Sequence, residues 1–175
     1  MNQQASNIPP GLTGLPVATH VGRPPGALYA VIAGHPFFEG MAETHLKMLA
    51  SLAMERRFLA GDHIFKQGEL ANRFYLILDG QVEIRSQSSV AVATLIETVS
   101  SGDQLGWSWL FEPHFFHFSA RAITTTNTIF FYGTVLRQQC DDDHELGFAI
   151  MKRIARSMTR DLSAFHQNQR SKQII

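Results

Sequence analysis

The sequence contains one cysteine and no long apolar run. A single cysteine, Cys140, excludes an intrachain disulfide. No stretch approaches the roughly 20 consecutive apolar residues that a membrane-spanning helix needs. The N-terminus also lacks the charged segment followed by an apolar segment that marks a secretory signal. We therefore expect a cytoplasmic protein without a membrane partner.

Charge of neither sign is in excess, because fifteen Lys and Arg residues balance fifteen Asp and Glu residues. A nucleic-acid-binding domain usually carries a clear excess of basic residues, so we expect no nucleic-acid partner. The sequence also lacks a nucleophile beside a general base, a glycine-rich phosphate loop with its lysine, and a pair of catalytic carboxylates. These absences make an enzyme the least expected class.

The cysteine and the histidines offer little chemistry by themselves. Cys140 precedes three aspartates, residues 141–143, whose negative charge raises the pKa of a thiol. We therefore interpret this cysteine as structural or incidental. His114 and His117 are three residues apart with no other His or Cys nearby. Zinc needs three or four protein ligands, so the sequence predicts no metal site.

Composition divides the chain into a tail, a domain and a second tail. Residues 1–26 are rich in Pro and Gly, which resist helix and strand; they form either a disordered tail or an arm that lies on a partner subunit. Residues 27–167 carry the patterns of one domain, and residues 168–175 follow it as a tail. Residues 27–34 and 42–54 predict two short helices at the start of the domain.

The middle of the domain, from about residue 55 to 133, has the two-residue periodicity of strands. Asp79-Gly80 lies between two β-prone runs, residues 74–78 and 81–85. Such a sequence predicts a β-hairpin. Further strands are predicted over residues 63–65, 90–98, 119–126 and 128–132. Several short strands with turn residues between them indicate a mainly β sandwich or barrel with flanking helices.

A long helix is predicted from about residue 144 to 167, after aspartates that can cap its start. Its apolar residues recur at spacings of three and four, which places them in one stripe. The stripe can pack on its own barrel or on a second copy of the helix, and the second alternative predicts a homodimer through this helix. The stripe consists of Met151, Ile154, Met158, Leu162 and Phe165.

A turn, one possible helical turn and an aromatic loop fill residues 102–118. Gly106 opens the helical turn, and its backbone N–H group can approach an anion because no Cβ stands in the way. Trp107, Ser108 and Trp109 follow it, and a strand that contains Arg121 comes after the loop. This stretch is the candidate ligand site.

The order of these features resembles the cyclic nucleotide-binding domain family, the effector domain of catabolite-activator-type regulators and of kinase regulatory subunits. The resemblance covers about residues 35 to 165 and implies an eight-stranded, jelly-roll-like β-roll with N-terminal helices and a long C-terminal helix. Regulators of the catabolite-activator type continue into a winged helix-turn-helix, which we do not expect here because the chain stops at Ile175. The residues that carry the resemblance are 35–38, 58–69, 74–82, 102–106 and 120–122.

In that family, residues 106–121 correspond to the phosphate-binding cassette. The resemblance places a ribose-binding glutamate directly after the glycine, where this chain has Trp107. It places a phosphate-binding arginine five residues before Arg121, where this chain has Phe116. For Arg121 itself it implies no direct phosphate contact. Loss of two charge-assisted hydrogen bonds, roughly 1.5–3 kcal/mol each, predicts cyclic nucleotide binding weaker by about a hundred- to ten-thousand-fold.

The remaining cassette is aromatic and contains two histidines. Its rings either fill the core or provide a stacking surface for an adenine or nicotinamide ring, and His114 and His117 can donate hydrogen bonds to a phosphate. The candidate ligand-binding residues are Gly106, Trp107, Ser108, Trp109, His114, Phe116, His117 and Arg121.

The chain also resembles the accessory subunit of soluble NAD-reducing hydrogenases. That resemblance implies a non-catalytic regulatory subunit of a larger enzyme complex, without a covalent cofactor, that binds NADPH or another nucleotide. Two alternatives stay open: a structural interaction subunit without a ligand, and a weak cAMP or cGMP sensor.

Overall fold

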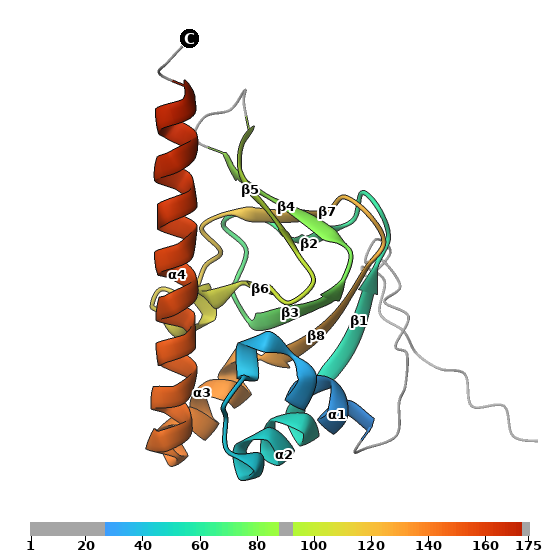
Figure 1. The fold of residues 1–175 in the computed structure, drawn as a ribbon, viewed down its shortest axis with the longest axis vertical. Coiled ribbons are helices and arrows are strands. Elements are labelled where there is room, and N and C mark those ends of the chain that lie inside the picture. The colour runs from blue at the N-terminus through green and yellow to red at the C-terminus, as the bar shows by residue number, and fades with distance from the viewer. Residues whose placement is uncertain (1–26, 88–92, 173–175) are drawn as a thin grey trace, which may run out of the picture.

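The computed structural model describes residues 27–87 and 93–172 of the chain. Eight strands in this part of the chain form two four-stranded antiparallel sheets, with helices at one end and along one side (Figure 1). This architecture confirms the predicted β-roll. The expected N-terminal arm, residues 1–26, lies outside the described residues, as do residues 90–92 of one predicted strand.

The N-terminal helices are α1 (Ala27–Gly34), η1 (Pro36–Phe38) and α2 (Glu43–Leu52). They confirm both helices predicted at the start of the domain. Leu46 and Leu49 are buried on the apolar side of α2. His35 anchors η1, because its Nδ1 accepts a hydrogen bond from the backbone N–H of Phe37 and its Nε2 lies 3.2 Å from the carbonyl oxygen of Ile77.

Each sheet contains four strands, and the chain passes from one sheet to the other several times. The first sheet contains β1 (Met54–Phe58), β8 (Thr126–Tyr132), β3 (Arg73–Asp79) and β6 (Gln104–Leu105), in that order. The second sheet contains β2 (His63–Phe65), β7 (Ser119–Ala122), β4 (Gln81–Gln87) and β5 (Ala93–Ser100), in that order.

The hairpin predicted at Asp79-Gly80 is wrong, although both of its strands exist. β3 pairs with β6 and β8, whereas β4 pairs with β5 and β7, so the chain crosses here from one sheet to the other. Gly80 has a φ of 98°. A Cβ built at Gly80 would lie 2.5 Å from Oγ1 of Thr126. The glycine therefore allows a tight corner against the start of β8 instead of a two-residue turn between paired strands.

The strands predicted over residues 119–126 and 128–132 also differ from the structure. The break lies at residues 123–125, not at Asn127, and the two strands belong to different sheets. Thr126 is the first residue of β8 and is fully buried. Its Oγ1 donates a hydrogen bond to the carbonyl oxygen of Thr124, which helps to stabilise this second crossing.

The first sheet is buried on both faces. Phe74 and Leu76 point to the helices, whereas Tyr75 and Ile77 point into the roll between the sheets. Successive side chains of a strand point to opposite faces of the sheet. Because both faces of this sheet are covered, β3 needs apolar residues at consecutive positions. The described residues therefore form two hydrophobic cores, one under the helices and one inside the roll.

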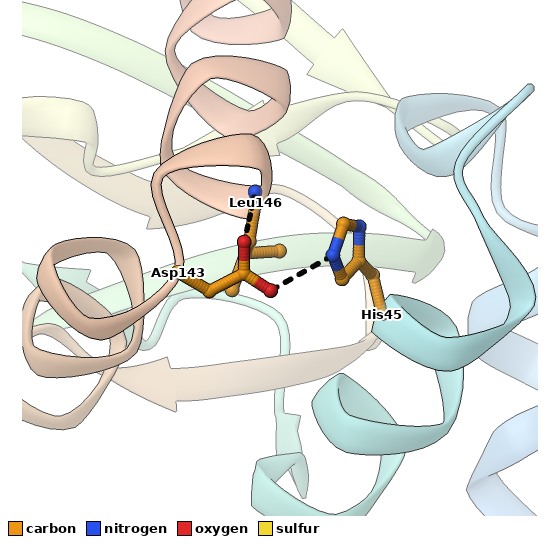
Figure 2. Close-up of polar contacts among 3 residues, drawn as sticks. All are labelled: His45, Asp143 and Leu146. Carbon is orange, nitrogen blue, oxygen red and sulfur yellow. Dashed lines mark hydrogen bonds and ion pairs between the residues drawn. The ribbon is translucent and has the colours of Figure 1, made fainter.

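Two helices complete the domain, α3 (Gly133–Asp142) and α4 (His144–Lys172). Asp143 lies between them and caps α4, as predicted, because its Oδ1 accepts a hydrogen bond from the backbone N–H of Leu146 at 3.0 Å (Figure 2). Its Oδ2 lies 3.0 Å from Nε2 of His45, so the same carboxylate joins the helix junction to α2. The hydrogen bond from Leu146, and then the contact with His45, lower the pKa of Asp143.

The predicted apolar stripe of α4 divides into two faces. Ile154 is buried against the domain together with Leu146 and Ile150. Met151 points away and is 52% exposed, and Phe148 is 70% exposed. The helix continues past the end of the roll (Figure 1). No helix among the described residues is both long and apolar enough to cross a bilayer.

Candidate functional site

The candidate site begins where β6 ends. Gly106 has a φ of 79° and is the N-cap of the single helical turn η2 (Trp107–Leu110). This turn confirms the one predicted after the glycine. A residue with a Cβ would be strained at this φ, which explains why the chain uses glycine here.

Phe116 occupies the position at which the family resemblance expects the phosphate-binding arginine. Its side chain is buried, with 5% exposed, and its ring stacks on Phe65 with centroids 3.9 Å apart and an interplanar angle of 12°. A Cβ built at Gly106 would lie 3.1 Å from Cε1 of Phe116. The same Cβ would lie 3.0 Å from the carbonyl oxygen of Arg73. The space beside the glycine is therefore taken up by the Phe116 ring and by the backbone of β3.

Trp107, Ser108 and His117 lie together at the outer edge of the same loop. The rings of Trp107 and His117 stack with centroids 6.0 Å apart and an interplanar angle of 17°. Oγ of Ser108 lies 3.2 Å from Nδ1 of His117. Ser108 is buried, Trp107 is half-buried and His117 is exposed. These three predicted site residues therefore form one group, with an imidazole on its solvent side.

Trp109 and His114 do not join this group. Trp109 is fully buried in the core under the helices, beside Phe74, and its Nε1 has no hydrogen-bond partner among the described residues. His114 has a φ of 57°, and its carbonyl oxygen accepts a hydrogen bond from the backbone N–H of Ala71 at 2.6 Å. Both residues therefore shape the loop rather than line a shared pocket.

Arg121 lies on the outside of the roll. Its two neighbours in β7, Ala120 and Ala122, are buried inside, whereas Arg121 is exposed. Its Nε donates a hydrogen bond to the carbonyl oxygen of Gly61 at 2.9 Å. This position agrees with the implication that the strand arginine makes no direct phosphate contact. Burial, followed by the nearby Lys66 and Arg121, lowers the pKa of His63 on the paired strand β2.

Phe65 is the site residue that sequence reasoning missed. It belongs to β2, which pairs with β7 so that Phe65 is opposite Ala120. Ile64 and Phe65 are both buried in the roll although they are neighbours in β2, because the register is irregular between His63 and Phe65. Nothing local in the sequence indicates that the ring of Phe65 meets Phe116. Among the described residues, no three His, Cys, Asp or Glu side chains come together as a metal site.

Comparison with known families matches residues 55–143 to the cyclic nucleotide-binding domain. The chain belongs to this family. A curated relative is the CRP-like cAMP-activated global transcriptional regulator of Mycobacterium tuberculosis, which is 24% identical over 130 residues, 74% of this chain. The chain spans 58% of the length of that relative. This relative is a transcriptional regulator, so it does not support our expectation that the chain has no nucleic-acid partner.

Solved structures share the fold. A cyclic nucleotide-binding domain from Methylobacillus flagellatus KT superposes with a TM-score of 0.73 at 16% identity, over 82% of this chain and 83% of that chain. The regulatory subunit of a cAMP-independent protein kinase A from Trypanosoma brucei has a TM-score of 0.67 at 18% identity, over 83% of this chain and 50% of that chain. A mutant of that subunit, in which one of three substitutions introduces an arginine, is bound to cAMP in its A site.

Proposed function

We propose that this chain is a non-catalytic regulatory module of the cyclic nucleotide-binding domain family that does not respond to cyclic nucleotides. The observation that carries the proposal is the stack of Phe116 on Phe65 beneath Gly106. An apolar ring there neither binds a cyclic phosphate nor leaves room for it. The module then acts through contacts with other proteins, its roll being filled by its own aromatic side chains.

Two energetic costs oppose the binding of a cyclic nucleotide. A phosphate that entered this loop would lack the arginine and the glutamate of the family, and each lost charge-assisted hydrogen bond weakens binding by roughly 1.5–3 kcal/mol. The phosphate would also have to displace the Phe116 ring from an interior to which it is well fitted. The regulatory subunit of the cAMP-independent kinase, with its cAMP-bound mutant, is an analogy on the same fold that supports this view.

Restoring the missing side chains tests the proposal. The double variant Trp107→Glu/Phe116→Arg supplies the ribose-binding carboxylate and the phosphate-binding guanidinium at their family positions. We expect calorimetric titration to show cAMP binding in this variant and none in the wild type. Phe115→Arg is the matched control. Phe115 is 46% exposed, so this substitution adds the same positive charge outside the roll. Binding by the wild type, or equal binding by the control, would contradict the proposal.

The prediction of NADPH as a ligand within a hydrogenase-type complex is a narrower proposal, and it rests on the resemblance alone. Its best location is the edge formed by Trp107 and His117, where a flat ring could stack. If NADPH binds there, it raises the melting temperature of the protein and Trp107→Ala abolishes the shift. An unchanged melting temperature at millimolar NADPH would contradict NADPH binding, and it would leave the proposal of a roll filled by its own side chains unaffected.

A homodimer through α4 is the second part of the proposal. Phe148, Met151 and Ala155 are exposed and follow each other at spacings of three and four, which is the seam pattern of a coiled coil. We expect light scattering to give twice the 19.6 kDa of one chain. Phe148→Glu should give the monomer, and Arg156→Gln, at an exposed position of the same helix outside this seam, should leave the dimer intact. A monomeric wild type would contradict this assignment. In the sequence, Met158, Leu162 and Phe165 continue the same spacing.

A further inference from the structure

A hollow of about 430 Å³ lies outside the roll, between α4, η1 and the turn that joins β5 to β6. Its volume falls in the range of small-molecule sites, about 300–1,000 Å³. None of the residues that line it belongs to the candidate site described above. The hollow is therefore a separate feature of the fold.

The walls of the hollow are held together by specific contacts. A Cβ built at Gly102, in the turn between β5 and β6, would lie 3.3 Å from Cγ of Pro36, so this turn packs closely on η1. From the opposite side, Nη2 of Arg153 on α4 donates a hydrogen bond to the carbonyl oxygen of Glu39 at 2.7 Å, and its Nη1 donates one to the carbonyl oxygen of Ala149 at 2.9 Å. Each Nη carries a second hydrogen that remains available to a ligand. These contacts therefore hold the sides of the hollow in place without a ligand.

Positive charge predominates on the helix wall. Arg153 and Arg156 are three residues apart on α4, so they lie on the same side of the helix. Burial, followed by the nearby charge of Arg156, lowers the pKa of Arg153. Glu39 is the one carboxylate among the lining residues, and it is exposed. Two adjacent guanidinium groups against one solvated carboxylate favour an anion between them.

A buried amide is part of the lining of the hollow. Gln104 is only 7% exposed, and its Oε1 has no hydrogen-bond partner among the described residues. Buried side-chain amides almost always have partners, because an unpaired one retains the full cost of leaving water. Gln104 lines the hollow, and its amide nitrogen, unlike Oε1, is not shut off from solvent, so its N–H groups are the ones available to a ligand.

We propose that this hollow binds the phosphate group of a small phosphorylated molecule. Phosphate oxygens can accept hydrogen bonds from the two guanidinium groups and from the Gln104 amide at the same time. Pro36 and Phe37 line the same hollow and offer apolar surface to the rest of the molecule. The proposed phosphate site shares no lining residue with the loop of residues 106–121. A test of this site is therefore independent of a test of the function proposed above.

Calorimetric titration of the full chain with inorganic pyrophosphate tests this site. We expect saturable binding by the wild type and binding weaker by about tenfold or more in Arg156→Gln, which loses one charge-assisted contact. Lys152→Gln is the control, because it removes the same charge from an exposed position on the same helix outside the hollow. Gln104→Leu should also weaken binding while it leaves the circular dichroism spectrum unchanged.

Three results would overturn the proposal. The first is the absence of saturable binding by the wild type. The second is an equal loss of affinity in Lys152→Gln, which would show attraction by general charge alone. The third is citrate binding as tightly as pyrophosphate, which would show an anion site that does not select phosphate.

Discussion

Replacement of Phe116 by alanine is the most direct way to measure how firmly the roll is filled by its own side chains. Phe116 is 95% buried, since only 5% of its surface is exposed, and it stacks on Phe65 at 3.9 Å. Truncation of a buried phenylalanine costs about 3–5 kcal/mol, because both the transfer free energy and the contacts around the new cavity are lost. Domains of this kind have a total stability of about 5–15 kcal/mol, so the loss is a large fraction of it.

The assay is chemical denaturation, supported by thermal melting. At about 2–4 °C per kcal/mol for a chain of this length, Phe116→Ala should lower the melting temperature by about 6–20 °C. Phe115→Ala removes the same side chain at the next position, where it is 46% exposed, and should cost less than about 1 kcal/mol. Equal effects of the two substitutions would refute the assignment of Phe116 to the interior of the roll.

Three further predictions follow from single residues. Burial, followed by two neighbouring aspartates, raises the pKa of Cys140 to about 11, so at pH 8 a thiol reagent should label the folded protein about tenfold or more slowly than the denatured protein. The pKa of Asp143 is lowered by the hydrogen bond from Leu146, so its stabilising effect is present above about pH 4 and is lost as the pH falls further. Asp143→Asn keeps the cap but should flatten the acid limb of a plot of stability against pH, and an unchanged limb would refute this role. Gly106→Ala should destabilise the protein more than Gly68→Ala in denaturation: both glycines have positive φ, but a Cβ at Gly106 would meet neighbours at 3.0–3.1 Å, whereas one at Gly68 meets none within 4 Å.

Local periodicity was sufficient to predict most elements of this fold. The change from a period of 3.6 to a period of two separated the helices from the strands, and the aspartate before the long helix was correctly identified as its cap. What local patterns could not show is which strands pair. Asp79-Gly80 has the sequence of a hairpin turn, but the tight approach of Thr126 makes it a corner between two sheets.

The candidate site shows the same limit. The absence of the family's arginine and glutamate could be read from the sequence, and it led to the central proposal. The partner of Phe116 could not, because Phe65 is about 50 residues away. The two meet through the pairing of β2 with β7 and through the backbone hydrogen bonds of Phe116 with Gly68 and Glu69. Likewise, a single stripe predicted on the long helix proved to be two faces, since periodicity alone does not distinguish Ile154, which packs on its own domain, from Met151, which does not.

The central claim is that the roll of this family member is closed to cyclic nucleotides by Phe116. The measurement that tests it most directly is a titration of the wild-type chain with cAMP in which NMR records the backbone amide signals of Gly106 and Trp107. Our account predicts no saturable shift of these signals up to about millimolar cAMP, because two charge-assisted hydrogen bonds are absent. Saturation at micromolar cAMP with shifts centred on Gly106 would contradict it.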